Sequence, residues 1–265
     1  MKMRRSLTRG LALALSALTL LLSGCGAAGT EKQEEITYTV PESAELVASE
    51  ATWELYDNGL FVFTGLSMPY ISNHDEVPWF PYMDQIREVV ITQPVDSISE
   101  FAFQDCVNLT RVTLPEGVER IKISAFSGCT ALKSIRLPES LREIEFWAFS
   151  NSGLEELVIP GMEKISNYAF QSCASLRRVV VSRGTVKIGF DVFEDCTSLE
   201  AIYLPQSVVS IGVYTFRGCD SLTDVYYGAG ESDWNAVAVE QEGNEPLLSA
   251  RLHTDAAPED VIASA

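Results

Sequence analysis

Histidine is nearly absent from this sequence, and His74 and His253 are its only two copies. The sequence also lacks a glycine-rich phosphate loop, a nucleophile elbow and the Asp-x-Asp-x-Asp-Gly loop that would hold calcium. Adjacent acids such as Glu155 and Glu156 could in principle serve glycoside hydrolysis, but neighbouring side chains on a strand point apart. These absences predict a chain with no catalytic activity, no cofactor and no metal, and they leave a hydrolase as a remote alternative.

Basic side chains are scarce as well. The first 24 residues carry four of the nineteen Lys and Arg residues and no acid, so the remainder has 15 basic against 37 acidic side chains, a net charge of −22. Such a charge repels nucleic acid and anionic membrane surfaces, so neither is an expected partner. Solubility at a crowded surface explains the charge most simply, and calcium bridging is the sharper alternative.

Phenylalanine, by contrast, recurs at a regular spacing. Its copies stand 23 residues apart, shortened once to 21, at Phe80, Phe103, Phe126, Phe149, Phe170, Phe193 and Phe216. An isoleucine stands five residues before each of the last six, at Ile98, Ile121, Ile144, Ile165, Ile188 and Ile211. No single helix or strand has this period, whereas a stack of similar coils does. The sequence therefore predicts a repeat solenoid, and its length places His74 and His253 about 30 Å apart by strand spacing.

Each repeat unit predicts one short strand and one tight turn. In the unit that begins at Ala125, Ile135 and Leu137 alternate across one residue, which is the spacing of a strand with both aliphatic side chains inward. Pro138 follows and ends the strand, because proline cannot donate a ladder hydrogen bond. The Ala-Phe-x-x-Cys run is too short for an independent helix and predicts a helical turn or 3₁₀ segment. Unit four, residues 148–168, lacks two residues and predicts a local irregularity.

The run Ala-Phe-x-x-Cys-x-x-Leu-x-x-Ile-x-Leu-Pro, residues 125–138, resembles the units of the BspA-like leucine-rich repeat family. The resemblance extends over residues 52–253 and departs from the pattern at Ser152 for Cys, Ser182 for Pro and Met83 for Cys in a degenerate first unit. It implies an α/β repeat solenoid with short parallel strands and short helical or 3₁₀ turns. It also implies a bacterial surface protein with a role in adhesion or recognition.

Both ends of the repeats resemble the ends of that family's domains. Residues 53–65 with Pro78-Trp79-Phe80 look like its N-terminal cap, and residues 225–236 look like its C-terminal end. Within the first stretch, Asn58-Gly59 stands between alternating apolar runs, which is typical of a type I′ hairpin. We therefore expect an N-terminal β-hairpin cap.

Five cysteines occupy one repeat position: Cys106, Cys129, Cys173, Cys196 and Cys219. In an exported chain this pattern first suggests disulfides, and adjacent strands about 5 Å apart would allow them by distance. In-register side chains point the same way, however, whereas a disulfide needs facing Cβ atoms. A line of thiols also cannot surround zinc tetrahedrally. The sequence predicts a buried ladder of free thiols.

The N-terminal segment predicts export and a lipid anchor. Basic residues, among them Lys2, Arg4 and Arg5, precede an apolar run, Leu11 to Leu22, that is too short for a stable transmembrane helix. Residues 22–25, Leu-Ser-Gly-Cys, look like a lipoprotein signal-peptidase box, which predicts lipidation at Cys25; an ordinary secretory cleavage is the alternative. Residues 25–45 are polar and predict a flexible tether. We expect a lipid-anchored protein of the bacterial cell envelope, outside the cytoplasm.

The residue between the two inward aliphatics of each strand faces outward and predicts the ligand surface. Towards the C-terminal end this column becomes apolar and aromatic, where a spacer would tolerate charges. Packing between neighbours along the ladder is the alternative interpretation. The predicted ligand-binding residues are Arg136, Val158, Val180, Tyr203 and Tyr226 in this column, with Arg111 and Arg178 in the adjacent charged column.

The predicted organisation has five parts: a lipoprotein signal peptide (1–24), a tether (25–45), a cap with the degenerate first unit (46–85), the solenoid (86–227), and a C-terminal cap and tail (228–265). The predicted function is that of a non-catalytic binding or adhesion module. Its ligand would be a protein or polysaccharide on a host or neighbouring cell. A structural envelope scaffold or spacer is the alternative.

Overall fold

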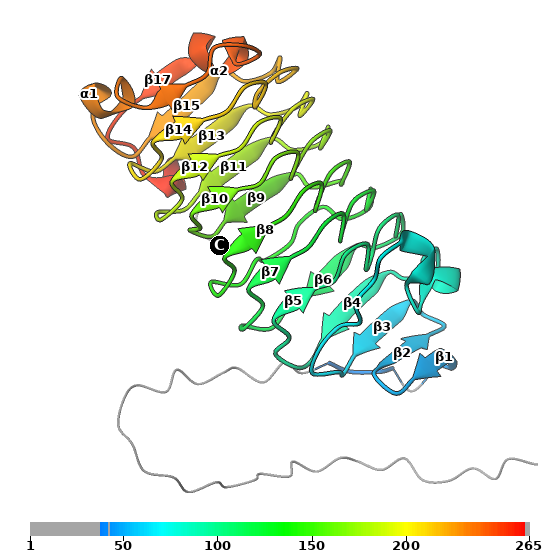
Figure 1. Ribbon diagram of the computed structural model, residues 1–265. Helices are drawn as coiled ribbons and strands as arrows, with labels where there is room; N and C mark the ends of the chain where they lie inside the picture. The colour runs from blue at the N-terminus through cyan, green and yellow to red at the C-terminus, as the bar shows by residue number, and fades with distance from the viewer. Residues whose placement is uncertain (1–37, 42, 263–265) are drawn as a thin grey trace, which may run out of the picture. The chain divides into compact units, whose positions relative to one another are not determined.

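The computed structural model of this chain describes residues 38–41 and 43–262. In this range the chain winds into coils that stack in one row, as Figure 1 shows. The predicted repeat solenoid is confirmed, with stacked parallel strands and little helix. The predicted signal peptide, Cys25 and most of the predicted tether lie outside the described residues.

The coils contribute strands to two columns. The first column holds β1 (Leu46–Glu50), β2 (Trp53–Tyr56), β3 (Leu60–Phe63), β4 (Glu88–Ile91), β6 (Arg111–Thr113), β9 (Glu156–Ile159), β11 (Arg178–Val181), β13 (Ala201–Leu204), β15 (Asp224–Tyr227) and β17 (Arg251–His253). The second holds β5 (Ser97–Ile98), β7 (Arg120–Ile121), β8 (Glu143–Ile144), β10 (Lys164–Ile165), β12 (Lys187–Ile188), β14 (Ser210–Ile211) and β16 (Ala238–Val239). From β3 onward the paired strands run parallel, so each repeat position lies beside its equivalent in the next coil.

The second column is interrupted in the shortened unit, as predicted, but the first is interrupted one coil earlier. The strand predicted around Ile135 and Leu137 is absent there, although both side chains are buried as expected. The first column breaks between β6 and β9, and the second breaks between β8 and β10. Two glycines make the shortened loops possible. A Cβ on Gly153 would stand 2.1 Å from the Thr130 carbonyl oxygen, and one on Gly161 would stand 2.0 Å from the Arg183 carbonyl oxygen. Any side chain there would push neighbouring coils apart.

Helix is confined to the two ends of the described chain, so the expected α/β character is not confirmed. The helices α1 (Glu231–Trp234) and α2 (Glu245–Ser249) follow the repeats. The 3₁₀ turns are η1 (His74–Glu76), η2 (Phe80–Tyr82) and η3 (Pro258–Asp260). No helix in residues 38–41 and 43–262 has the length and apolar character to cross a membrane.

Left-handed residues keep the Ala-Phe-x-x-Cys segment from forming a helix. In the unit that begins at Ala125, Ser124 has a φ of 54° and Gly128 has a φ of 73°. The equivalent positions in the other coils are also left-handed: Phe101, Asp105, Trp147, Asn151, Tyr168, Ser172, Asp191, Asp195, Tyr214 and Gly218. A right-handed helix needs a φ near −63° at every residue. The prediction of helical or 3₁₀ turns within the repeats is therefore wrong, and the segment is a series of single turns.

Stacked aromatic rings fill the core of the row. Successive Phe rings lie 5.3 to 5.6 Å apart at their centroids and are nearly parallel, from Phe103 through Phe126, Phe149, Phe170, Phe193 and Phe216. Trp79, not Phe80, begins this stack, at 5.8 Å from Phe103. Phe80 is exposed and packs edge-on against His74. The assignment of Phe80 as the first repeat phenylalanine is wrong, because the 3₁₀ turn η2 shifts the first unit by one residue.

The turns of successive coils are joined by hydrogen bonds that all run one way. Phe103, Phe126, Phe149, Phe170 and Phe193 each donate their N–H to a carbonyl of the following coil, and the left-handed residues on either side do likewise. Carbonyl groups therefore point towards the first coil and N–H groups towards the last. An alternation of right- and left-handed residues aligns the peptide groups in this way. The carbonyl groups of the first coil and the N–H groups of the last coil therefore have no repeat coil beyond them to pair with.

Side chains of matching polarity satisfy both ends of this directional ladder. At the first coil, the buried indole of Trp79 donates to the Ala102 carbonyl at 2.6 Å, and His74 Nε2 lies 3.2 Å from the Gln104 carbonyl. At the last coil, Asn244 Oδ1 accepts from the Phe216 N–H at 3.0 Å. These contacts give hydrogen-bond partners to backbone groups at both ends of the row. A buried backbone group without a partner would destabilise the folded state by about 1–3 kcal/mol.

The N-terminal hairpin is present, but its turn differs from the predicted one. β2 and β3 pair antiparallel, with Leu55 opposite Phe61. The Gly59 N–H donates to the Tyr56 carbonyl, and only Gly59 is left-handed, with a φ of 85°. A type I′ turn would need positive φ at Asn58 as well. The loop is therefore three residues long with a glycine bulge, and β1 adds a third, outer strand.

The five repeat cysteines are buried and free, as the ladder interpretation predicts. Their thiols also have a role that the sequence did not indicate. Cys129, Cys173, Cys196 and Cys219 each donate at 3.1 to 3.2 Å to the carbonyl of the phenylalanine in the preceding coil. Burial raises the pKa of the Cys106 and Cys196 thiols well above the usual range. These two thiols therefore stay protonated. At Cys173 burial also acts to raise the pKa, but hydrogen bonds with Cys196 and Ser152 outweigh it and lower the pKa.

Candidate functional site

The predicted outward strip does not form one exposed surface. Strand pairing brings Val158, Val180, Tyr203 and Tyr226 side by side, as predicted. Val158 is 48% exposed, but Val180 and Tyr203 are only 3% and 8% exposed. The prediction that all four face solvent is therefore wrong for Val180 and Tyr203. Tyr226 is half-buried and stacks on His253, with ring centroids 4.4 Å apart.

The chain's own C-terminal segment, residues 255–262, covers the buried part of this strip. Val261 packs with Val180 and Tyr203 in a small apolar cluster separate from the main core. The backbone N–H groups of Asp255 and Ala256 donate to the carbonyls of Ala229 and Tyr227, which fixes the start of the segment. Periodicity could not reveal this, because the segment lies outside the repeats and has no strand or helix pattern of its own.

Tyr203 lies flat along the sheet under this segment. A Cβ on Gly228 would stand 2.4 Å from the Tyr203 hydroxyl, so the glycine leaves room for the phenol to reach the next coil. Burial raises the pKa of the Tyr203 phenol, and the nearby carboxylates of Glu259 and Asp260 add to the rise. The positive charge of Arg183 acts to lower the pKa of the phenol. The covering segment thus brings two acids to a site that also has a basic side chain.

An N-terminal segment covers the other end of the same face. Val40 packs on Leu60, Val62 and Val90, which form a second apolar cluster outside the main core. This contact corrects the prediction of a free tether for residues 38–41. A shallow cavity of about 330 Å³ lies beside it, lined by Tyr38, Thr39, Pro41, Asn58, Leu60, Glu88, Val90, Arg111 and Thr113.

Between the two covered ends, the middle of the face is open. Arg136 and Val158 occupy the outward position of consecutive coils, and both are exposed. Arg136 forms no ion pair or side-chain hydrogen bond with any residue in the described part of the chain, whereas Arg111 and Arg178 do. Of the seven predicted ligand-binding residues, these two present the most accessible combination of charge and apolar surface. We name Arg136 and Val158 the open window.

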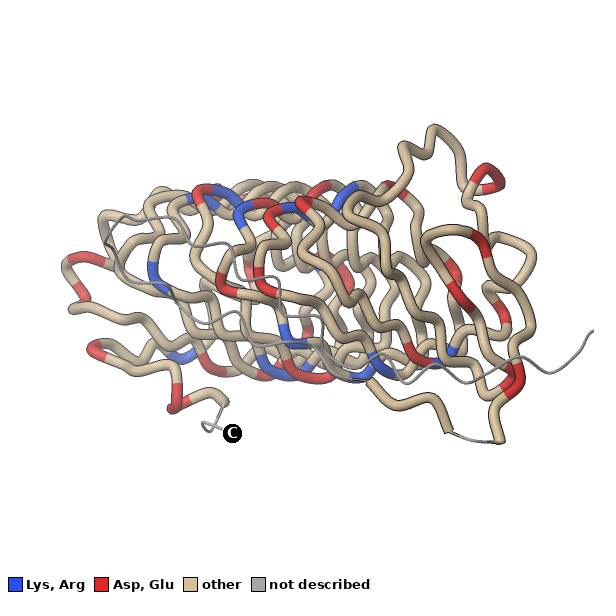
Figure 2. Tube along the Cα trace, turned by 90° about the horizontal axis from the view of Figure 1, so that it is seen from below, with Lys and Arg blue, Asp and Glu red and all other residues tan. Residues whose placement is uncertain are grey.

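The adjacent charged column is largely paired within the molecule. Arg178 contacts Glu156 at 2.7 Å in the preceding coil and Glu200 at 3.9 Å in the following one. Arg111 lies 3.9 Å from Glu88. Figure 2 shows most basic positions in the middle coils, and residues 38–86 contain no Lys or Arg at all. These exposed pairs contribute little stability individually, about 0–1 kcal/mol each.

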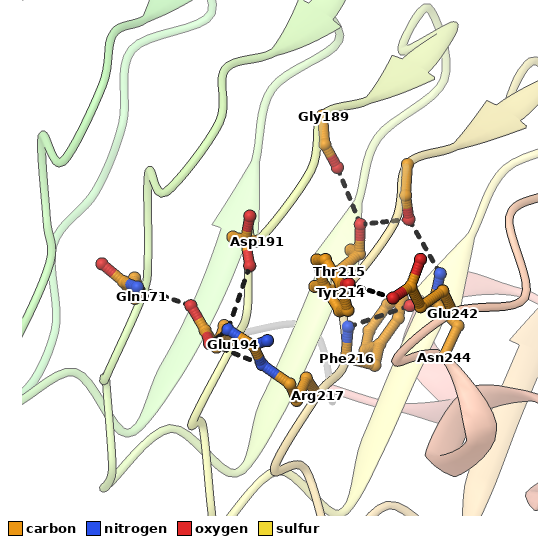
Figure 3. A network of polar contacts seen from close by, with 11 residues as sticks. Gln171, Gly189, Asp191, Glu194, Tyr214, Thr215, Phe216, Arg217, Glu242 and Asn244 are labelled. Carbon is orange, nitrogen blue, oxygen red and sulfur yellow. Dashed lines mark hydrogen bonds and ion pairs between the residues drawn. The ribbon is translucent and has the colours of Figure 1, made fainter.

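A polar network lies on the turns near the C-terminal end of the repeats (Figure 3). Arg217 contacts the Glu194 carboxylate and lies 3.6 Å from Asp191, and its guanidinium stacks over Tyr214 at 4.4 Å. Gln171 donates to the other oxygen of Glu194. Burial, followed by the neighbouring Glu194, raises the pKa of Asp191 to about 6. Side-chain donors, above all Arg217, lower the pKa of Glu194 despite its burial.

This network contains Glu194 but neither of the two histidines. The adjacent acids Glu155 and Glu156 are both exposed and pair with Lys133 and Arg178. Another adjacent pair, Glu194 and Asp195, is split between different surroundings, since Glu194 is buried and Asp195 exposed. His74 and His253 lie at opposite ends of the row, and His253 is bound to Asp224 at 2.7 Å. Among the described residues, no three His, Cys, Asp or Glu side chains are placed to hold a metal ion.

An exposed aromatic cluster, which sequence reasoning missed, lies on the turns that follow β8, β10 and β12. Its members, here called the aromatic ladder, are Phe146, Trp147, Tyr168 and Phe190. Trp147 and Tyr168 stack with centroids 5.1 Å apart and planes 12° from parallel. The signal was visible in the sequence as aromatic residues at two neighbouring repeat positions, two and three residues before the repeat phenylalanine. It was not on the strands, where the ligand surface was expected.

Comparison with known proteins agrees with this architecture. A family model described as "BspA type Leucine rich repeat region" matches six copies over residues 96–223. No curated protein matches the chain. Two solved structures are leucine-rich repeat proteins, one from T. pallidum (29% identity, 71% of this chain and 81% of that one, TM-score 0.47) and one from Bacteroides ovatus (18% identity, 82% and 71%, TM-score 0.46).

A third solved structure is the pneumococcal vaccine antigen PcpA. It has 16% identity to this chain and a TM-score of 0.53, and the match covers 78% of this chain but 48% of that one. At this identity the likeness concerns the fold alone. The chain thus spans about half the length of that antigen.

Proposed function

Because the chain belongs to the proteins that carry a leucine-rich repeat region of the BspA type, we propose that it is a non-catalytic recognition module. Its ligand is a short protein segment that binds on the outward face of the first strand column. The observation that carries this proposal is that residues 255–262, which include the 3₁₀ turn η3, already lie on that face. A surface that holds one short segment of this chain is suited to hold a similar segment of another.

The contacts of residues 255–262 define the chemistry of a suitable ligand. Val261 supplies an aliphatic side chain to the surface made by Val180 and Tyr203. Glu259 and Asp260 place acidic groups near Tyr203 and Arg183. A ligand with one aliphatic anchor and flanking acids reproduces these contacts, and burial of such an anchor is worth about 1.5–3 kcal/mol. The open window extends the surface, because Arg136 offers an additional unpaired charge for an acidic side chain.

The proposal is tested by removing the internal segment and supplying it as a peptide. The chain is ended after Thr254, and a fluorescent peptide of residues 255–265 is titrated into it. We expect saturable binding to the shortened chain and at least about tenfold weaker binding to the full chain, whose surface is occupied. A peptide with Val261→Asp is the control for the apolar anchor. Equal binding of both peptides, or none to a shortened chain that remains folded, would refute the proposal.

The place of action that fits this module is the bacterial cell envelope, with the lipidated Cys25 as anchor and a host or neighbouring cell as source of the ligand. Cys25 lies outside the described residues, so this part rests on the signal-peptidase box alone. One observation favours the alternative of a structural spacer. The charged column pairs with itself, as Arg178 with Glu156, and offers few free charges to a partner. The peptide titration separates the two functions, since a spacer needs no binding surface.

A further inference from the structure

The aromatic ladder is not required by the fold. Trp147 and Tyr168 occupy the left-handed position before the Ala-Phe pair, with φ of 55° and 60°. Ser124 and Asp191 fill the same position in neighbouring coils. A bulky side chain with positive φ is uncommon and strained, whereas Asp tolerates this region. Phe101 and Tyr214 are also aromatic at this position, but the coils of Ser124 and Asp191 form without a ring, so the coil does not require one.

The ladder is also accessible. Trp147 is 41% exposed, and Phe146 and Phe190 are exposed to a similar degree. Tyr168 stacks on one face of the Trp147 indole, and the coil beyond the other face carries Ser124 in place of a ring. The indole therefore ends the stack of parallel rings with no ring stacked on its other face, and Phe146 lies beside it, tilted by 45° at 6.0 Å. Contiguous exposed apolar surface of this kind is typical of binding sites.

The charged groups next to the ladder are bound within the molecule, because Glu145 accepts from the Ile123 N–H at 3.1 Å and both Asp191 and Glu194 contact Arg217. In the coils of Phe126, Phe149 and Phe170, three turn positions hold uncharged residues: the third and second residues before the phenylalanine and the residue after it. These nine residues are Ile123, Ser124, Ser127, Phe146, Trp147, Ser150, Asn167, Tyr168 and Gln171. Within the described residues, the hydroxyl groups of Ser124, Ser127 and Ser150 form no hydrogen bond. Such a surface complements a ligand that is itself neutral and rich in hydroxyl groups.

We propose that the aromatic ladder is a second binding site and that it takes a neutral glycan chain. A pyranose ring has an apolar face of C–H groups, which the electron-rich face of an indole attracts, and a polar rim of hydroxyls. The free face of Trp147 binds such a ring, and the serine hydroxyls exchange hydrogen bonds with its rim. The ladder continues over three coils, which suits a linear polymer that runs along the row. This site is independent of the proposed peptide surface on the strands.

The test uses the full chain with two neutral hexasaccharides, cellohexaose and chitohexaose, by calorimetry and by tryptophan fluorescence. Trp147 is the one exposed tryptophan in the described residues, because Trp53 and Trp79 are buried and Trp234 is half-buried. We expect at least one of the two sugars to bind saturably and to protect Trp147 from acrylamide quenching. Trp147→Ser, which copies the preceding coil, should weaken binding at least about tenfold with no change in melting temperature.

Tyr70→Ser is the matched control, because Tyr70 is the most exposed aromatic residue described, at 83%, and lies in a loop outside the ladder. It should bind the sugars as the parent does. The proposal is overturned if neither hexasaccharide binds, or if Trp147→Ser binds as tightly as the parent. Protection of Trp147 by decaproline and by neither sugar would likewise overturn it, in favour of a peptide-docking surface.

Discussion

At the scale of single residues, the ends of the row depend on side chains that match the direction of the backbone ladder. Trp79 supplies a donor where carbonyls are free, and Asn244 supplies an acceptor where N–H groups are free. The sequence places Trp79 within a stretch that resembles a cap, but it does not reveal this hydrogen bond. The direction of the ladder follows from the left-handed residues, which composition and periodicity do not indicate.

Replacement of Trp79 by Phe tests the importance of the indole donor. The ring stack with Phe103 would persist, but the buried Ala102 carbonyl would lose its partner. We expect the free energy of unfolding in urea to fall by about 1–3 kcal/mol. Trp53→Phe is the matched control, because the Trp53 indole donates to the Glu50 side chain at the surface, where water can replace it. Equal losses in both variants would assign the effect to ring size and not to the hydrogen bond.

Asp191 is the residue at which stability is expected to depend on pH. Its folded pKa of about 6 lies above its ordinary value of 3.8, so the folded chain binds this proton more tightly than the unfolded chain does. The stabilisation is complete below about pH 3.8 and is lost as the pH rises through about 6. Asp191→Asn should therefore lessen the fall in melting temperature between about pH 4.5 and about pH 7. Asp195→Asn, at an exposed neighbour, should leave the profile as in the parent.

At the scale of elements, the repeat pattern predicted the strands well and the turns poorly. The alternating aliphatic pairs located most strands of the first column, because alternation along a strand is a direct consequence of the pleat. The second column, at the isoleucine position, was missed because one strand was expected in each unit. The turns depend on single left-handed residues such as Trp147 and Tyr168, for which side-chain type is a weak guide. The same limit applies to the first unit, where Trp79 and Phe80 are equally plausible core residues until η2 fixes which one turns inward.

The hairpin of β2 and β3, with β1 outside it, closes the first end of the strand column. Its loss would expose the buried residues Val89 and Ile91 of β4 and one face of Trp79. Deletion of residues 46–63 should therefore cause aggregation, because an open strand edge beside apolar surface pairs with other chains. Light scattering after size-exclusion chromatography measures this. A monomeric truncation with the melting temperature of the parent would show that the hairpin is dispensable.

At the scale of the whole molecule, the predicted lipid anchor at Cys25 determines where the proposed module acts. Replacement of Cys25 by Ser should abolish incorporation of a radioactive fatty acid in growing cells, while the repeat domain stays folded. The five repeat thiols are buried and cannot accept the label in its place. Labelling that persisted in the Cys25→Ser chain would contradict the lipoprotein prediction.

The location of the binding surface could be predicted only in part. Strand register correctly aligned Val158, Val180 and Tyr203, since in-register pairing follows from equal repeat lengths. Their exposure could not be predicted, because the segment that covers two of them lies outside the repeats. The sequence contains Val261 with its neighbouring acids, but only the folded chain brings them to the face 60 to 80 residues earlier.

The central claim is that residues 255–262 are a detachable occupant of a recognition surface and not a permanent part of the solenoid. Hydrogen exchange of the full chain tests it most directly. The amides of Asp255 and Ala256, which are bonded to Ala229 and Tyr227, should exchange by local opening, at least about a hundredfold faster than the strand amides of β11 and β13. Exchange of all these amides at one rate, through global unfolding only, would contradict the account and make the segment a structural cap.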